Sequence, residues 1–128
     1  MIIDIVVPVF NAAALLRRCL AALDRHTPPE QAQLLLIDDA SPDPGIQTLL
    51  ADWQANSPLR PTLLLNPENL GFVGTVNRAF SCTDNDVLLL NADTEVTPGW
   101  LDRMTAALRS YPRISTVTPF TTNAYSIS

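Results

Sequence analysis

The chain has 128 residues, a length typical of one domain, and 47% of them are hydrophobic, which is too many for a disordered chain. Its 13 acidic and 8 basic residues give a net charge of −5, and the basic residues form no cluster, which argues against nucleic-acid binding. All the basic residues are Arg, so chemistry that needs a Lys side chain is excluded. The single histidine, His26, also excludes a histidine-rich metal site.

The sequence also bears on cellular location. The N-terminal segment lacks the positive region and the cleavage site of a signal peptide, and no apolar run is long enough to span a bilayer. Cys19 and Cys82 lie far apart, and each falls in an apolar helical pattern, so we expect two buried free thiols and no disulfide framework. Together these features predict a cytoplasmic protein.

Short apolar runs alternate with helical patterns along the chain. Strands are predicted at residues 2–7, 34–37, 62–65, 87–90 and 114–117, with the first strand ended by Pro8. Helices are predicted at residues 12–23, 46–53, 73–80 and 98–108. This alternation predicts an α/β fold in which βα units form a mostly parallel sheet with helices on both faces.

Two of the predicted helices carry more specific expectations. Asn11 precedes the first helix and is expected to cap its N-terminus. In the third helix, Val73, Val76, Asn77 and Phe80 follow helical spacing and are expected to form the face that packs on the sheet.

Polar residues follow each of the first four predicted strands, in segments 8–11, 38–43, 66–71 and 91–95. The carboxyl ends of parallel strands lie at one edge of the sheet, where ligands bind in folds of this class. Acidic groups from different strands therefore converge, and their like charges repel unless a cation or ligand hydrogen bonds compensate them. We therefore expect a ligand site at this edge.

Asn91 and Asp93 are separated by one residue, so in an extended segment both oxygens point the same way. Such oxygen ligands suit Mg²⁺ or Mn²⁺, which is often shared with phosphate groups. An Asx-turn is the competing interpretation of this pair.

Asp39 offers a different chemistry, because a carboxylate only accepts hydrogen bonds and matches the imino N–H of uracil, thymine or guanine. Phe10 is either an apolar face for such a base or a partly buried core aromatic. As a purely structural alternative, Asp39, Ser41 or Asp43 caps the following helix.

Four segments together resemble the donor half of a family 2, GT-A-type glycosyltransferase. They are residues 5–11 (IVVPVFN), 36–43 (LIDDASPD), 69–77 (NLGFVGTVN) and 89–96 (LLNADTEV). Each is weak alone, but the four occur in the family's order and spacing, and the match covers nearly the whole chain.

The resemblance implies an enzyme that transfers a sugar from a UDP-, dTDP- or GDP-sugar to an acceptor hydroxyl of a glycan or polysaccharide, with inversion, using Mn²⁺ or Mg²⁺. It implies that Asp39 accepts from the base and that Asn91 and Asp93 meet the ribose and the metal. The full set of nucleotide-sugar-binding residues implied in this way is Pro8, Phe10, Asn11, Asp39, Asn69, Gly71, Asn77, Asn91 and Asp93.

The sequence departs from the family pattern in two ways. Asn91 stands where the family has the first Asp of its Asp-x-Asp motif, so metal contact rests mainly on Asp93. The family's catalytic base lies downstream, in the acceptor half, and neither Glu95 nor Asp102 is assigned that role.

We therefore expect residues 1–128 to be the donor-binding portion of a truncated domain, inactive alone, with no catalytic residue of its own. We also expect self-association through uncovered apolar surface, and a place at the inner face of the membrane for the longer protein.

Three other classes of protein share this alternation of strands and helices. A non-catalytic nucleotide- or protein-binding α/β module has the same fold and stays open as the alternative. A receiver domain is disfavoured because segment 8–10 lacks the acidic pair and the chain lacks Lys. A dinucleotide-binding domain is disfavoured because the first turn lacks glycine.

Overall fold

The structure is a computed structural model that describes residues 3–110, 117–119 and 125–127. Its main element is a four-stranded sheet in the order β3-β2-β1-β4. Every neighbouring pair in this sheet is parallel. The strands are β1 (Ile3–Val9), β2 (Ala32–Asp38), β3 (Thr62–Leu65) and β4 (Asp86–Leu89). The parallel α/β fold predicted from the sequence is therefore confirmed.

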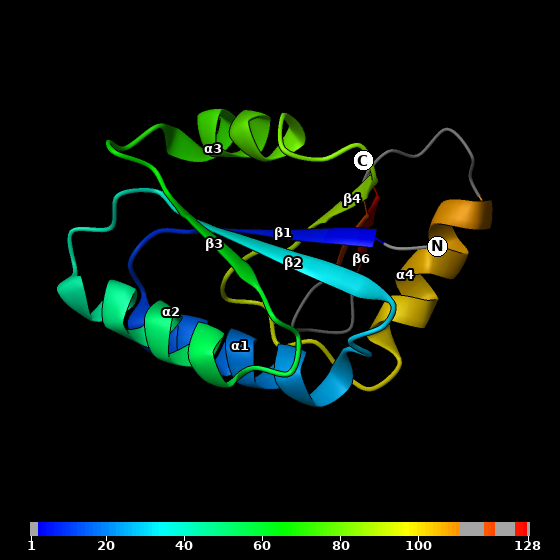
Figure 1. Ribbon diagram of the computed structural model, residues 1–128. Helices are drawn as coiled ribbons and strands as arrows, with labels where there is room; N and C mark the ends of the chain where they lie inside the picture. The colour runs from blue at the N-terminus through cyan, green and yellow to red at the C-terminus, as the bar shows by residue number, and fades with distance from the viewer. Residues whose placement is uncertain (1–2, 111–116, 120–124, 128) are drawn as a thin grey trace.

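Helices cover both faces of the sheet (Figure 1). They are α1 (Ala13–His26), α2 (Pro44–Asn56), α3 (Gly71–Phe80) and α4 (Trp100–Ser110). Helices α1 and α2 lie side by side on one face, and α3 lies alone on the other. A short antiparallel pair, β5 (Val117–Pro119) and β6 (Tyr125–Ile127), follows α4. The predicted strand 114–117 falls on residues outside the described part except for Val117.

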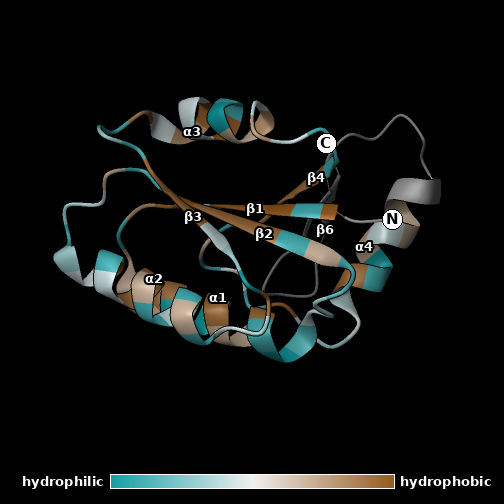
Figure 2. Ribbon diagram, viewed as in Figure 1, coloured by the Kyte–Doolittle hydropathy of each residue, from teal (hydrophilic) through white to brown (hydrophobic). Residues whose placement is uncertain are grey.

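The hydrophobic core is divided between the two faces because alternate strand residues point in opposite directions. The larger cluster joins β1, β2 and β4 to α1, α2 and α4, whereas a smaller cluster of Val6, Ile37, Ala79 and Val87 lies under α3. Figure 2 shows the matching hydropathy, with strands that are apolar over most of their length. Parallel strands buried on both faces have this composition.

Helices α1 and α2 are joined by a polar contact at their C-terminal ends. Asp24 accepts hydrogen bonds from the Trp53 indole N–H at 2.8 Å and from the Ser57 hydroxyl at 2.6 Å. Trp53 itself is buried, so its single donor is satisfied within the core. One carboxylate therefore fixes the relative position of the two helices.

The sequence predicts that Pro8 ends the first strand, but β1 continues to Val9. Pairing with β4 reaches only Val6, whose carbonyl accepts from the Leu90 N–H, whereas pairing with β2 continues to Val9. Backbone groups two residues apart point to the same neighbour, so the missing N–H of Pro8 faces the side where β4 has already left the sheet. Proline is tolerated here because no ladder hydrogen bond is lost.

Three local expectations were wrong. Asn11 does not cap α1: the capping position is Ala12, in a left-handed conformation with no side-chain cap. On α3 the buried face is Thr75, Val76 and Ala79, whereas Val73 is 70% exposed. Cys82 is exposed beyond the end of α3, although Cys19 is buried as predicted.

The rotation of α3 has a physical cause. Its first turn is fixed by backbone N–H groups bonded to Asp39, and Arg78 is directed inward to the Leu65 carbonyl at 2.9 Å. These polar contacts outweigh the burial of Val73 and Phe80, which stay exposed.

Candidate functional site

The loops that follow the four strands meet at the carboxyl edge of the sheet, as predicted. In chain order the sheet grows outward from β1 to β2 and β3 on one side and to β4 on the other. The order therefore reverses between β1 and β4, and open α/β sheets bind ligands at such a reversal. Pro8 lies on this side of β1, where the ladder to β4 has ended. The ladder between β1 and β4 thus ends at the place where a ligand is expected.

The loops after β1 and β2 are hydrogen-bonded to each other. The Asn11 N–H donates to the Ser41 hydroxyl at 2.9 Å, and the Asn11 side-chain oxygen accepts from the Asp43 N–H at 3.2 Å. Asn11, Ala12 and Ala40 all have positive φ, which is uncommon for residues with a side chain. Strained backbone of this kind is often found at functional sites. Asn11 therefore joins the loop after β1 to the loop after β2.

Phe10 and Pro8 form the apolar part of the same edge. Phe10 is 50% exposed, so it is not a core aromatic, and its ring is available to a ligand. Pro8 is half-buried in β1. Of the structural alternatives for the next loop, Asp43 is the residue that caps α2, accepting from the Gly45 N–H at 2.9 Å.

Asp39 is the most highly bonded side chain of the site. One carboxylate oxygen accepts from the Leu70 N–H at 2.7 Å and from the Asn66 amide at 2.8 Å, and the other accepts from the Gly71 N–H at 3.0 Å. Asp39 thus binds the N-terminus of α3 from a neighbouring strand, where a negative charge is stabilised. Desolvation by burial raises the pKa of Asp39, but these hydrogen bonds lower it more, so the net pKa lies below its ordinary value.

This arrangement modifies the expected role of Asp39. A carboxylate has about four acceptor positions, and three of them are used within the chain. The remaining position, on the oxygen that accepts from Gly71, is the one left for a base N–H. Gly71 adopts a φ of +76°, which directs its N–H to the carboxylate and is rarely adopted by other residues.

Behind Asp39 lies a network that the sequence interpretation missed. The Asn66 amide donates to the Thr75 hydroxyl at 2.9 Å as well as to Asp39, and Arg78 donates to the Asn66 oxygen at 2.6 Å. Asn66 and Thr75 are each only 1% exposed. The available signal was a Thr at a sheet-facing position of α3, which the pattern of larger apolar residues obscured.

Asn91 and Asp93 are both exposed at the end of β4, but their segment is not extended. The Thr94 N–H donates to the Asn91 carbonyl at 3.0 Å, which closes a turn. The same carbonyl accepts a weak hydrogen bond from the Cys19 thiol of α1, with sulfur and oxygen 3.9 Å apart. The backbone therefore forms a turn, but backbone groups close it, so it is not the Asx-turn considered from the sequence. Among the described residues, the side chains of Asn91 and Asp93 make no hydrogen bond, so both are free for a ligand.

The donor set at this turn suits a hard divalent cation that is shared with a diphosphate. Within residues 3–110 and the two short C-terminal strands, no cluster of three or more His, Cys, Asp or Glu side chains forms a closed metal site. Asp93 supplies a carboxylate and Asn91 a neutral amide oxygen. Mg²⁺ is commonly held by one or two carboxylates with phosphate and water completing the shell.

The remaining predicted residues differ in how closely they join the site. The Asn69 amide donates to the Asp39 carbonyl at 3.3 Å, and Gly71 binds the Asp39 carboxylate. Asn77 is exposed on α3, with no side-chain hydrogen bond in the described part of the chain. No hydrogen bond or ion pair links Asp93 to Asp39 among the described residues, so the edge holds two separate polar groups.

Comparison with known proteins agrees with this geometry. The family model described as Glycosyl transferase family 2 matches residues 4–125. The chain therefore belongs to glycosyl transferase family 2. A search of curated proteins found no match.

Solved structures show the same fold at low sequence identity. One is a complex of the mannosyltransferase PcManGT from Pyrobaculum calidifontis with GDP-Man and Mn²⁺, which has a TM-score of 0.75 and 23% identity over 83% of this chain and 32% of that one. Another is TarS 1–349 of S. aureus in complex with UDP-GlcNAc, with a TM-score of 0.72 and 20% identity over 88% of this chain and 32% of that one. The chain thus spans about a third of the length of these neighbours.

Proposed function

We propose that this chain binds a nucleotide-diphospho-sugar and a divalent cation, as the donor portion of an enzyme that transfers the sugar to an acceptor hydroxyl with inversion. The supporting observation is the placement of Asp93 and Asn91 on an exposed turn that follows β4, where the ladder between β4 and β1 ends. Family membership and the nucleotide-sugars named for the solved neighbours support the same class of donor.

Each residue of the edge has a task in this proposal. The Phe10 ring covers one face of the base, and the free acceptor position of Asp39 receives its imino N–H. Asp93, assisted by Asn91, holds Mn²⁺ or Mg²⁺, which when bound neutralises charge on the diphosphate leaving group. Pro8, Asn11, Asn69 and Gly71 shape the edge, and Asn77 is proposed to lie beside the donor.

Chemical transfer also needs a base that removes the acceptor proton, and no carboxylate of this chain is proposed for that role. We therefore expect the 128-residue chain to bind donor without transferring sugar. Sugar transfer by this chain alone, measured by release of the nucleoside diphosphate in the presence of acceptor glycans, would contradict this part of the proposal.

The test is calorimetric titration of UDP, dTDP and GDP into the chain, with and without Mn²⁺. The proposal predicts that one of the three nucleotides binds and that its binding requires Mn²⁺. It also predicts that Asp93→Ala abolishes this Mn²⁺-dependent binding. Glu95→Ala is the matched control, because Glu95 is also an exposed carboxylate of the same loop. Loss of binding in both variants would indicate a general charge effect and not a metal ligand.

A non-catalytic binding module is the alternative, and the same titration separates the two. Metal-independent binding of nucleotide, or none by a folded chain, would favour the module. Among the described residues, no helix is long and apolar enough to cross a membrane. We propose a cytoplasmic location, with the longer protein at the inner face of the membrane, and polysaccharide or glycan as acceptor.

Self-association is also part of the proposal. Phe72 and Val73 of α3 are 58% and 70% exposed, and apolar surface of this kind favours contact between copies. Sedimentation at increasing protein concentration tests this expectation, and a monomer at all concentrations would contradict it.

A further inference from the structure

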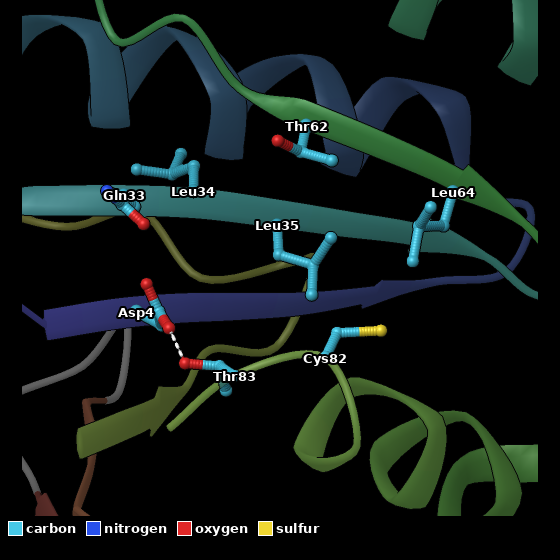
Figure 3. A pocket seen from close by; sticks show the side chains of 8 residues that line it. All are labelled: Asp4, Gln33, Leu34, Leu35, Thr62, Leu64, Cys82 and Thr83. Atoms are coloured by element: carbon cyan, nitrogen blue, oxygen red, sulfur yellow. Dashed lines mark hydrogen bonds between the residues drawn. The ribbon is translucent and has the colours of Figure 1, made fainter. Parts of the chain in front are cut away.

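A cavity of about 280 Å³ is separate from the edge described above. It opens on the α3 face of the sheet near the start of the strands, where the loop after α3 approaches β1. Asp4 of β1, Gln33 and Leu35 of β2, and Thr62 and Leu64 of β3 line it, with Cys82 at its side (Figure 3). The proposed donor site lies at the opposite, carboxyl edge. The cavity is therefore independent of the proposed function.

The lining follows directly from strand geometry. Asp4 and Gln33 are paired in the register of β1 and β2, so their side chains lie side by side. Leu35 and Thr62 are paired in the same way between β2 and β3. Residues two apart share a face, so one polar row and one mainly apolar row form the floor.

Asp4 supplies an uncompensated negative charge. It is 6% exposed, and one of its oxygens accepts from the Thr83 hydroxyl and, at 3.4 Å, from the Asn85 amide. Within the described residues, the other oxygen accepts no hydrogen bond and no Arg or His forms an ion pair with Asp4. Figure 3 shows this second oxygen on the side of Gln33, away from Thr83.

The chemistry of the lining selects one class of ligand. An anion is repelled by Asp4, and a hard metal ion finds only one carboxylate in the lining of this cavity. A purely apolar ligand would take the unbonded Asp4 oxygen out of water without giving it a partner, which is costly. We propose that this cavity binds an alkylammonium group, whose N–H donors pair with Asp4 and Gln33 while its short apolar stem lies against Leu35 and Leu64.

Cys82 gives a direct way to test the proposal. Its thiol lies at the cavity and is exposed, whereas Cys19 is fully buried, so disulfide reagents label Cys82 selectively. We would measure, by mass spectrometry, the rates at which aminoethyl and hydroxyethyl disulfides label the 128-residue chain. The expected preference for the aminoethyl label is about fivefold, as for a partly exposed ion pair.

Charge variants show whether Asp4 causes the preference. Asp4→Asn keeps an acceptor for Thr83 and is expected to reduce the ratio of rates to about one. Asp84→Asn removes the same charge from an exposed position near Cys82 and should leave the ratio high. The proposal would be overturned if Asp4→Asn had the same ratio of aminoethyl to hydroxyethyl labelling rates as the unchanged chain. It would also be overturned if Asp4→Asn and Asp84→Asn lowered this ratio equally. Gln33→Glu must raise the ratio, and this variant decides the question if Asp4→Asn does not fold.

Protection experiments separate a free amine from the side chain of a polypeptide. Butylammonium chloride and Nα-acetyl-lysine amide would each be added before the hydroxyethyl reagent, with sodium chloride at equal ionic strength as the control. Protection by butylammonium alone indicates a small-molecule site, and protection by both indicates a site for a lysine side chain. Protection by neither overturns the proposal.

Discussion

The Cys19 thiol and the Asn91 backbone carbonyl lie 3.9 Å apart, although the residues are 72 positions apart in the chain. Cys19 is in the middle of α1 and fully buried, and Asn91 starts the turn that carries Asp93. The thiol thus packs against the backbone of the proposed metal-binding turn and donates a weak hydrogen bond to it. Burial raises the pKa of Cys19 to about 12, and the nearby charges of Asp93 and Glu95 contribute to the increase.

We predict that alkylation separates the two cysteines. At pH 8 iodoacetamide should modify one thiol per chain, at Cys82, because Cys19 is inaccessible and stays protonated. Peptide mass spectrometry identifies the site. As a control, Cys82→Ser should show no label at all. Modification of both residues in the folded chain would contradict the burial of Cys19.

Removing the support of the turn should affect both stability and metal binding. Cys19→Ala is expected to lower the free energy of unfolding by about 1 kcal/mol and to weaken Mn²⁺ binding several-fold, because the turn loses a packed neighbour. Denaturation and the electron paramagnetic resonance signal of free Mn²⁺ measure these effects. Cys82→Ala is the matched control and should change neither, since its side chain is exposed.

Asp39→Asn should destabilise the loop before α3. The variant presents an NH₂ group where the carboxylate now accepts, so at least one of the donors on Leu70, Gly71 and Asn66 loses its partner. We expect a loss of about 2 kcal/mol in the free energy of unfolding. Asp43→Asn is the control, because that exposed side chain accepts from one backbone N–H through one oxygen.

The contribution of Asp39 should also depend on pH. Its pKa in the folded chain lies below the ordinary value of 3.8, so the folded state binds the proton less readily than the unfolded state. The stabilisation is therefore fully present above pH 4 or so and is lost as pH falls through the folded pKa. Melting temperatures measured from pH 7 to pH 3 should fall less steeply for Asp39→Asn than for the unchanged chain. Parallel curves would contradict the prediction.

Phe10→Ser should weaken nucleotide binding with little effect on folding. The ring is 50% exposed, so folding gains little from it, whereas stacking on a base is worth about 1–3 kcal/mol, or roughly fivefold or more in affinity. Calorimetry with the nucleotide that binds best gives the affinity. Leu15→Ser is the control, since Leu15 is 43% exposed on α1. An equal loss in both variants would exclude a specific role for the ring.

The fold was predictable because its signal is repeated. Strands rich in Val, Leu and Ile alternate with helices four times, and each repetition restricts the topology in the same way. The rotation of α3 was not predictable, because it depends on Asp39, more than thirty positions away, which binds Leu70 and Gly71. Asn11 misled for a similar reason: its side chain accepts from Asp43 and not from its own helix.

The candidate site shows the same division. Asn91 and Asp93 were found because they come directly after a predicted strand and are one residue apart, and both features can be seen in the local sequence. The thiol contact beneath their turn was missed, because it joins the turn to α1, and sequence spacing does not reveal that contact. The Asn66 network was hidden because Thr75 is a small polar residue among larger apolar ones.

Pro8 has a consequence for how the protein can change over evolution. Pro8 has no N–H, so changes in the surrounding side chains cannot extend the ladder between β1 and β4 to this residue. Substitutions at Phe10, Asn11 or the turn after β4 can alter which molecule is accepted without changing where this ladder ends. The specificity of the edge is thus free to diverge, while one imino acid keeps the end of the ladder in place.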